Sequence, residues 1–164
     1  KDVTSTEKYT SDYMLHRNFN ERSYMAFNID QIRDRFSGFK FQTTAFLGYG
    51  YRVVNNDTTQ LSIEAGPGYR HDRERDTGSN NEEAITRIGL NYAWNIAPNV
   101  KFIEEFTADL GSHNNIYRSE TGLQSQINGS LATKITYKIS HQDEVPVDKE
   151  NTDTEFGVTL VYSF

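Results

Sequence analysis

Three of the four histidines in this 164-residue chain stand close to carboxylates in polar segments. The pairs are His71 with Asp72, His113 with Asp109, and His141 with Asp143. A histidine beside a carboxylate can serve as a general base, so a hydrolase of the protease or lipase type is one interpretation. No serine or other nucleophile stands in a defined motif, and solvated loops are rich in the same residue types. We therefore expect a protein that is not an enzyme, and keep the hydrolase as the alternative.

Charged residues of both signs form a second set that could do chemistry, because they recur on one face of a period-two pattern. If they pair, they would fill the interior of a barrel; if water surrounds them, they would line a passage for ions or small solutes. We expect a largely filled or narrow interior. The residues are Arg52, Glu64, Arg70, Arg87, Lys101, Glu105, Arg118, Glu120, Lys134, Lys138 and Glu155.

Acidic residues gather in the polar links and could hold divalent cations together with lipopolysaccharide phosphates, because hard cations prefer oxygen ligands. A solvated loop is the ordinary interpretation of such a run, so we expect no metal centre and no cofactor. The absence of cysteine excludes disulfides and thiolate metal sites. The residues are Asp72, Asp76, Glu82, Glu83, Asp143, Glu144, Asp148 and Glu150.

The elements that carry these residues are predicted to be β-strands. In the final segment, EFGVTLVYSF, apolar residues at every second position from Phe156 to Phe164 predict a strand with one apolar face. The same alternation recurs along the chain and predicts about nine antiparallel strands and no convincing helix. No run approaches the roughly 18 apolar residues of a membrane-spanning helix. We treat residues 1–164 as one all-β domain.

The connections between the predicted strands differ in length. INGS around Asn128 and Gly129 predicts a two-residue type I′ turn, and the links at 97–99 and 55–57 are equally tight. Longer polar links are predicted at 72–83, 111–115 and 142–151, so short and long links mostly alternate along the chain. The links at 35–38 and 16–22 do not fit this alternation. Short turns at one end and long loops at the other predict an outer-membrane β-barrel with periplasmic turns and extracellular loops.

Aromatic residues on the apolar face are expected to form two girdles around an aliphatic band, the pattern that lipid interfaces select. Alternation alone also fits a soluble, lipocalin-like barrel with its apolar face inside, but the girdles and the loops favour the membrane. One girdle, near the short turns, is Tyr51, Trp94, Phe102, Tyr162 and Phe164. The other is Phe39, Phe41, Tyr69, Tyr117 and Phe156.

Composition and strand number set further expectations. A net charge of -6 argues against a nucleic-acid partner. If the last strand ends in the periplasm, nine strands place Lys1 outside the cell, whereas single-chain bacterial barrels have an even strand number. We therefore expect an odd number of strands upstream, or one misread strand. Within the chain, Gly-Pro-Gly in EAGPGYR (64–70) predicts a bulge or local break beside which solute could pass.

Several blocks in order resemble the DUF481 family, among them GYGYRVVNNDTTQLSIEAGPGYRHD, EEAITRIGLNYAWNI and NTDTEFGVTLVYSF. The resemblance covers the chain from about Ser37 onward, and EKYTSDYMLHRNFNERSYMAF more loosely. Members include proteins labelled salt-induced outer membrane proteins. The resemblance implies a barrel of about twelve strands in the outer membrane of a Gram-negative bacterium.

Partners and a role are further expectations; the function of the family is unsettled, and of these expectations the resemblance itself implies only the recognition of a terminal aromatic. The partners are outer-membrane lipid, lipopolysaccharide, and the barrel-assembly machinery that reads a terminal aromatic such as Phe164. The role is envelope-structural or stress-related, with passage of small solutes or ions as a further expectation. The alternative is an outer-membrane enzyme with a site at the extracellular rim.

Overall fold

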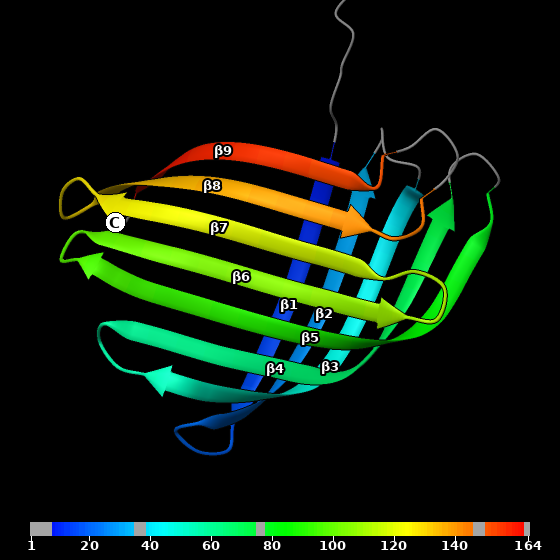
Figure 1. Ribbon diagram of the computed structural model, residues 1–164, viewed down its shortest axis with the longest axis horizontal. Helices are drawn as coiled ribbons and strands as arrows, with labels where there is room; N and C mark the ends of the chain where they lie inside the picture. The colour runs from blue at the N-terminus through cyan, green and yellow to red at the C-terminus, as the bar shows by residue number, and fades with distance from the viewer. Residues whose placement is uncertain (1–7, 35–38, 75–77, 146–149, 163–164) are drawn as a thin grey trace, which may run out of the picture.

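The period-two alternation produces nine strands in the computed structural model, which describes residues 8–34, 39–74, 78–145 and 150–162. All neighbouring strands are antiparallel, and their order in the sheet follows the chain (Figure 1). The described residues contain no helix long and apolar enough to cross a membrane. The strands are β1 (Lys8–Asn18), β2 (Ser23–Asp34), β3 (Phe39–Asn55), β4 (Thr59–Glu74), β5 (Asn80–Ala97), β6 (Val100–Gly111), β7 (Ile116–Gln126), β8 (Leu131–Gln142) and β9 (Thr152–Tyr162).

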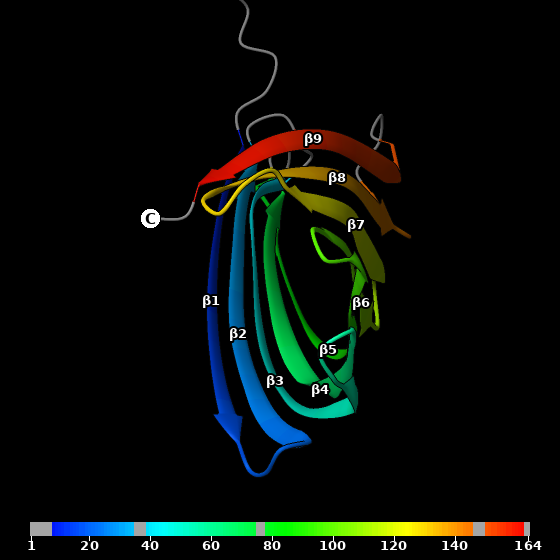
Figure 2. The ribbon, with the colours of Figure 1, turned by 90° about the vertical axis from the view of Figure 1, so that its left-hand side faces the viewer.

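The sheet curls into a half-barrel, so that β1 to β3 lie opposite β6 to β8 across its concave side (Figure 2). Twist along each strand produces such coiling, and bulges increase it locally. Register shifts lie between Phe39 and Phe41, between Arg52 and Val54, and between Asn95 and Ala97. Among the described strands, β1 and β9 are the two edges of the sheet. The predicted all-β, antiparallel, barrel-like fold is confirmed.

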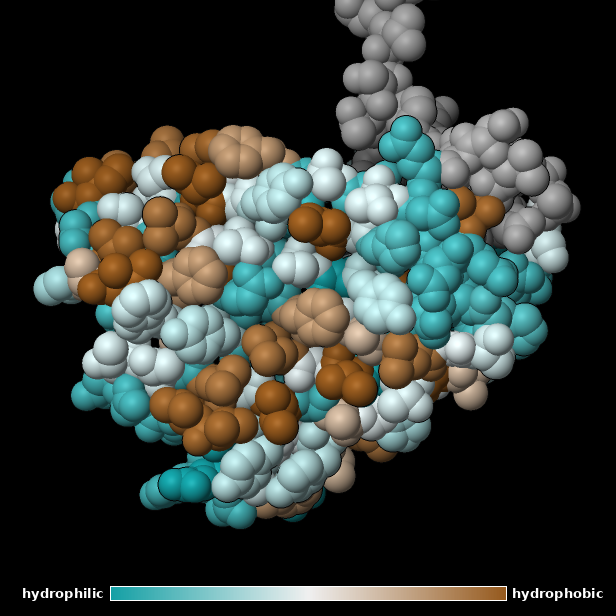
Figure 3. All heavy atoms as spheres, in the orientation of Figure 1, coloured by the Kyte–Doolittle hydropathy of each residue, from teal (hydrophilic) through white to brown (hydrophobic). Residues whose placement is uncertain are grey.

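The two faces of the sheet differ in chemistry. On the convex face, apolar side chains such as Leu47, Ile88 and Leu160 are exposed. Figure 3 shows apolar side chains spread over the face formed by β5 to β9, with hydrophilic residues gathered toward the end that carries the 112–115 link. On the concave face, charged residues are buried, among them Arg70 and Arg87. A soluble sheet protein normally has the opposite arrangement.

A small aromatic core lies on the concave face. Tyr24, Ala26 and Phe46 are buried together. Glycine makes room for both rings, because a Cβ on Gly48 would stand 2.1 Å from Phe46 and one on Gly50 would stand 2.2 Å from Tyr24. Aromatic packing on this face was not predicted from the sequence.

The predicted type I′ turn at Asn128 and Gly129 is wrong. β7 ends at Gln126 and β8 begins at Leu131, and among the described glycines Gly78 alone has a positive φ. A type I′ turn requires positive φ at both central residues. Instead, the Asn128 side chain accepts hydrogen bonds from the backbone N–H groups of Ser130, at 2.9 Å, and Leu131, at 3.0 Å.

The links at the two ends of the sheet differ less in length than predicted. The first link is not an exception, because β1 continues to Asn18 and the Asn20 side chain accepts hydrogen bonds from Arg22 N and Ser23 N, each at 2.8 Å. The longest link, 143–151, carries most of the remaining difference. The links at one end are 19–22, 56–58, 98–99 and 127–130, and those at the other are 35–38, 75–79, 112–115 and 143–151.

The interruption at Pro67 is a break in the ladder and not a bulge. Phe46 pairs with Gly68 and Tyr49 with Ala65, so the register is the same on both sides. The space expected beside the glycines is filled. A Cβ on Gly66 would stand 2.2 Å from the carbonyl oxygen of Leu47, and one on Gly68 would stand 3.0 Å from the Ile85 side chain. Glycine is therefore required here by close backbone approach.

Candidate functional site

The structure places all eleven predicted interior charges on the concave face. The face of each residue follows from the strand register, because residues that pair directly on neighbouring strands lie on the same face. Arg87 pairs with Asp109, Glu105 with Glu120, and Lys138 with Glu155. The remaining pairs are Arg52 with Ser62, Glu64 with Gly89, Arg70 with Glu83, Lys101 with Gln124, Arg118 with Ser140, and Lys134 with Thr159.

Arg87 on β5 is the centre of the largest charge network. Its Nε and Nη2 donate to the two carboxylate oxygens of Asp109 at 2.6 and 3.0 Å, and its Nη1 donates to Asp30 at 2.6 Å. Arg118 donates to the same Asp109 at 3.0 Å. Arg87 is 5% exposed and Asp109 is 0% exposed. Two arginines and two aspartates therefore neutralise one another where water is largely excluded.

The bond from Arg87 to Asp30 crosses the concave side, because β5 and β2 are not neighbours in the sheet. On the way, the guanidinium lies 5.5 Å from the centre of the Phe46 ring, within the range of a cation–π contact. Arg87 thus links four strands, β2, β5, β6 and, through Asp109 and Arg118, β7.

Arg70 on β4 forms a second cluster nearer the long-loop end. It is 1% exposed and contacts Glu83, the carbonyl oxygen of Asn114 at 2.7 Å, and Asp72 at 3.3 Å. Arg70 Nη1 and Asp72 Oδ1 are buried without a hydrogen-bond partner among the described residues. Buried polar atoms of this kind normally bind ordered water, so the protein groups alone do not satisfy this cluster.

Two further groups lie nearer the short-turn end. Glu120 accepts from Lys134 and from Lys138, each at 3.0 Å. The Tyr24 hydroxyl donates to Glu64 at 2.6 Å, and the Arg52 guanidinium lies 4.7 Å from the centre of the Tyr24 ring. Tyr24 is as buried as Arg87, but the side chains of Glu120, Lys134 and Lys138 are 24%, 26% and 46% exposed, against 6% for Arg87. The Glu120 group is therefore more open to solvent than the Arg87 network.

The partners within these groups differ from those expected. The acidic residues of the predicted set are all glutamates, but the described acidic partners of Arg87 and Arg118 are aspartates. Asp30 was missed from the sequence. The alternation along β2 could have predicted it, because Met25, Phe27 and Ile29 lie on the apolar face and Asp30 therefore lies on the other face.

The predicted girdle residues that the structure describes lie on the convex face. Those near the short turns are Tyr51, Trp94, Phe102 and Tyr162, and those near the other end are Phe41, Tyr69, Tyr117 and Phe156. The side chain of Phe39 and all of Phe164 fall outside the described residues.

Tyr51 also contacts the link between β1 and β2. Arg22 in that link donates to the Tyr51 hydroxyl at 3.4 Å. This bond raises the pKa of Arg22 further above its usual value, so the guanidinium stays charged at this end of the sheet.

A carboxylate on the convex face was also missed. Glu104 pairs with Thr121, and Phe106 with Ser119, so all four side chains point outward. Glu104 accepts from Ser119 Oγ at 2.6 Å and from Thr121 Oγ1 at 2.5 Å. The sequence could have predicted this, because successive strand residues point to opposite faces, and Glu104 must therefore lie on the face opposite to Glu105.

The histidines do not form the expected pairs, apart from one. His71 contacts Glu82 at 3.1 Å and lies 5.4 Å from the Phe41 ring, whereas Asp72 points to the opposite face. His141 does contact Asp143, at 3.6 Å.

His113 contacts Glu83 at 3.7 Å, while Asp109 is held by arginines. Ser112 also approaches His113, at 2.9 Å, but both partners meet the same Nδ1. A nucleophile–base–acid relay uses opposite ring nitrogens, so this arrangement does not form one.

The acidic loop residues do not converge in the described part of the chain. There, no three His, Asp or Glu side chains are placed to hold a metal ion. Glu83 binds Arg70, Glu82 binds Tyr69 at 2.6 Å, and Asp143 accepts from Asn115 at 2.8 Å. Asp76 and Asp148 fall outside the described residues.

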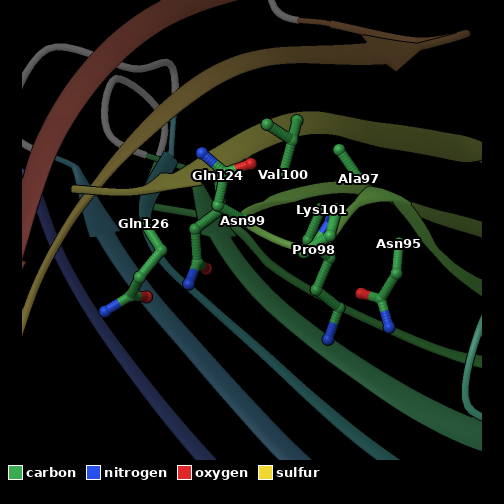
Figure 4. A pocket seen from close by; sticks show the side chains of 8 residues that line it. All are labelled: Asn95, Ala97, Pro98, Asn99, Val100, Lys101, Gln124 and Gln126. Atoms are coloured by element: carbon green, nitrogen blue, oxygen red, sulfur yellow. The ribbon is translucent and has the colours of Figure 1, made fainter. Parts of the chain in front are cut away.

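A small polar cavity of about 150 Å³ lies where the short-turn ends of β5, β6 and β7 meet (Figure 4). Its polar lining includes Lys101, Gln124 and Gln126. Ligand sites for drug-sized molecules are about 300 Å³ or larger, so this cavity fits only ions, water or a very small solute.

The chain matches, over residues 1–164, the family described as "Protein of unknown function, DUF481". No curated protein sequence matches the chain.

Proposed function

The chain belongs to the DUF481 family, and on that premise we propose that it forms the wall of a β-barrel in the outer membrane of a Gram-negative bacterium, with an envelope-structural role. One observation carries the proposal: the exposed face is apolar and the buried face is charged. Leu160 is 69% exposed and Ile88 is 45% exposed, whereas Arg87 is 5% exposed. Apolar residues outward and polar residues inward are the pattern of membrane barrels.

The open edges of the sheet are consistent with this proposal only if they are paired in the assembled barrel. Unpaired backbone groups in hydrocarbon cost several kcal/mol each, by order of magnitude. The edges of β1 and β9 therefore need partner strands, supplied by other parts of the same protein or by a second chain. With the short turns placed in the periplasm, the 112–115 and 143–151 links lie outside.

We propose that the interior is closed rather than an open pore. The Arg87 network joins β2, β5, β6 and β7 and packs against Phe46. The second candidate is passage of small ions, and the more exposed Lys138 and the cavity beside Lys101 favour it. The expected partners are membrane lipid, lipopolysaccharide, and assembly machinery that binds the terminal Phe164.

Trp94 provides a direct test, because it is the single tryptophan of the chain and lies on the convex face, 42% exposed. The protein is refolded into vesicles that contain brominated lipid, and quenching of Trp94 fluorescence is measured. Strong quenching by bromine, with little quenching by aqueous iodide, is the expected result.

The matched control moves the tryptophan to the concave face as W94F/F46W, where bromine is expected to quench little. Strong quenching of this double variant, with none of the native protein, would overturn the proposal, as would failure of the native protein to insert. Planar-bilayer conductance of the native preparation separates the two candidates, since a silent, inserted barrel supports the closed interior and discrete steps support ion passage.

A further inference from the structure

A second hollow, of about 530 Å³, lies on the convex face of β1, β2 and β3 near the long-loop end. Its size is within the range of ligand sites, about 300 to 1,000 Å³. It is separate from the charged concave face and from the cavity beside Lys101. Its lining residues are Tyr9, Ser11, Gln31, Arg33, Lys40 and Phe41.

Strand register explains why these residues meet. Tyr9 pairs with Arg33 and Ser11 with Gln31, and each pair shares the convex face with Phe27 and Ile29 of β2. Lys40 lies at the register shift between Phe39 and Phe41. A bulge of this kind re-aims a side chain, and Lys40 lines the hollow together with Phe41.

Among the described residues, no carboxylate compensates the charge of the hollow. Neither Arg33 nor Lys40 has an ion-pair partner among the residues that the structure describes. By contrast, Arg70, Arg87 and Arg118 on the concave face each contact a carboxylate. Two cations in one hollow, with no ion-pair partner in the described part of the chain, suit an anion, since both arginine and lysine bind phosphate well.

The neighbouring side chains favour an amphiphile over a free anion. Tyr9 on β1 is 63% exposed, and Phe41 on β3 lines the same hollow from the other side of β2. Aromatic side chains near the end of membrane-spanning strands typically lie at the boundary between acyl chains and headgroups. Charged and aromatic groups together therefore match a phosphate that is attached to a lipid.

We propose that this hollow binds a phosphate of the phosphorylated glycolipid of the outer leaflet, the lipid A part of lipopolysaccharide. The inference rests on the proposed function, which places the long-loop end at the outer leaflet. Arg33 and Lys40 hold the phosphate, and Tyr9 and Phe41 contact the sugar and the start of the acyl chains.

The test uses the full protein in phosphatidylcholine nanodiscs, titrated with diphosphoryl lipid A and followed by native mass spectrometry. In R33Q/K40Q, binding is expected to weaken by about 25-fold, since each cation near an anionic headgroup contributes about fivefold. The matched control R17Q removes a convex-face cation of β1 at the opposite end and is expected to bind as the native protein does. Q31K adds a cation to the lining and is expected to strengthen binding.

Three outcomes would overturn the inference. R33Q/K40Q could bind lipid A as tightly as the native protein does, the native protein could bind dephosphorylated lipid A as tightly as diphosphoryl lipid A, or phosphatidylglycerol could displace lipid A at an equal concentration. Competition by inorganic phosphate at similar concentration would also contradict it, because it would identify a free-anion site. Insertion is verified separately by Trp94 quenching, so an inserted protein without selective lipid A binding refutes this inference and leaves the proposed function intact.

Discussion

Arg87 and Asp109 face each other on neighbouring strands and form two parallel hydrogen bonds, of 2.6 and 3.0 Å. The pair is buried on the face that carries the charges, while leucines and isoleucines of the other face are exposed. Bidentate geometry makes this the best-defined ion pair of the concave face. Its removal therefore tests how much the charged network contributes to stability.

Removing one partner of this pair is expected to destabilise the protein strongly. D109A leaves Arg87 and Arg118 close to each other without their shared carboxylate, and breaking a buried pair in this way costs about 3–5 kcal/mol. The double variant R87M/D109L removes both charges and is expected to cost less than D109A alone. Urea unfolding in vesicles, followed by Trp94 fluorescence, measures both free energies. An equal loss in D109A and in the double variant would contradict the account.

Gly66 is expected to tolerate no side chain. In G66A the new Cβ would meet the Leu47 carbonyl oxygen at 2.2 Å, and backbone cannot move aside as a flexible side chain can. We expect a loss of about 1–3 kcal/mol, typical of overpacking, or failure to fold. The control is G89A, whose Cβ would stand 3.6 Å from its nearest neighbour. Comparable unfolding free energies for G66A and G89A would show that Gly66 has room.

The Tyr24 hydroxyl is expected to contribute more to stability than an ordinary tyrosine hydroxyl. Y24F leaves the Glu64 carboxylate without its donor at 2.6 Å, and hydrogen bonds to charged groups are worth about 1.5–3 kcal/mol. The comparison is Y49F, whose hydroxyl donates to the neutral Ser23 at 2.7 Å and is worth about 1 kcal/mol. The same urea titration gives the unfolding free energies of both variants, and a larger loss in Y49F than in Y24F would contradict this ranking.

The Glu104 patch tests the convex face. E104L alone leaves the Ser119 and Thr121 hydroxyls without their acceptor, whereas E104L/S119A/T121V removes the whole polar set. Replacing both partners of a hydrogen bond by apolar groups can be neutral or stabilising, so the triple variant is expected to be more stable in vesicles than E104L. If the patch instead contacts a partner protein, the triple variant will insert normally but lose a cross-linked species that the native protein forms.

Local pattern alone predicted the faces of the strands. Arg87, Glu105 and Lys138 could be placed on one face and Ile88, Leu90 and Trp94 on the other, because successive strand residues point in opposite directions whatever the rest of the chain does. Turn geometry was less predictable. Asn128 and Gly129 carry a type I′ signal, yet the Asn128 side chain caps a longer link.

The tertiary structure decided which charges meet. Arg87 reaches Asp30, which is 57 positions away in the sequence, because the sheet curls and β2 comes opposite β5. Curvature depends on twist, on bulges such as the one after Phe39, and on glycines that accept the Phe46 and Tyr24 rings. The alternation of residues is a property of each strand by itself and can be read from sequence, whereas curvature is a sum over all strands and appears only when they pack.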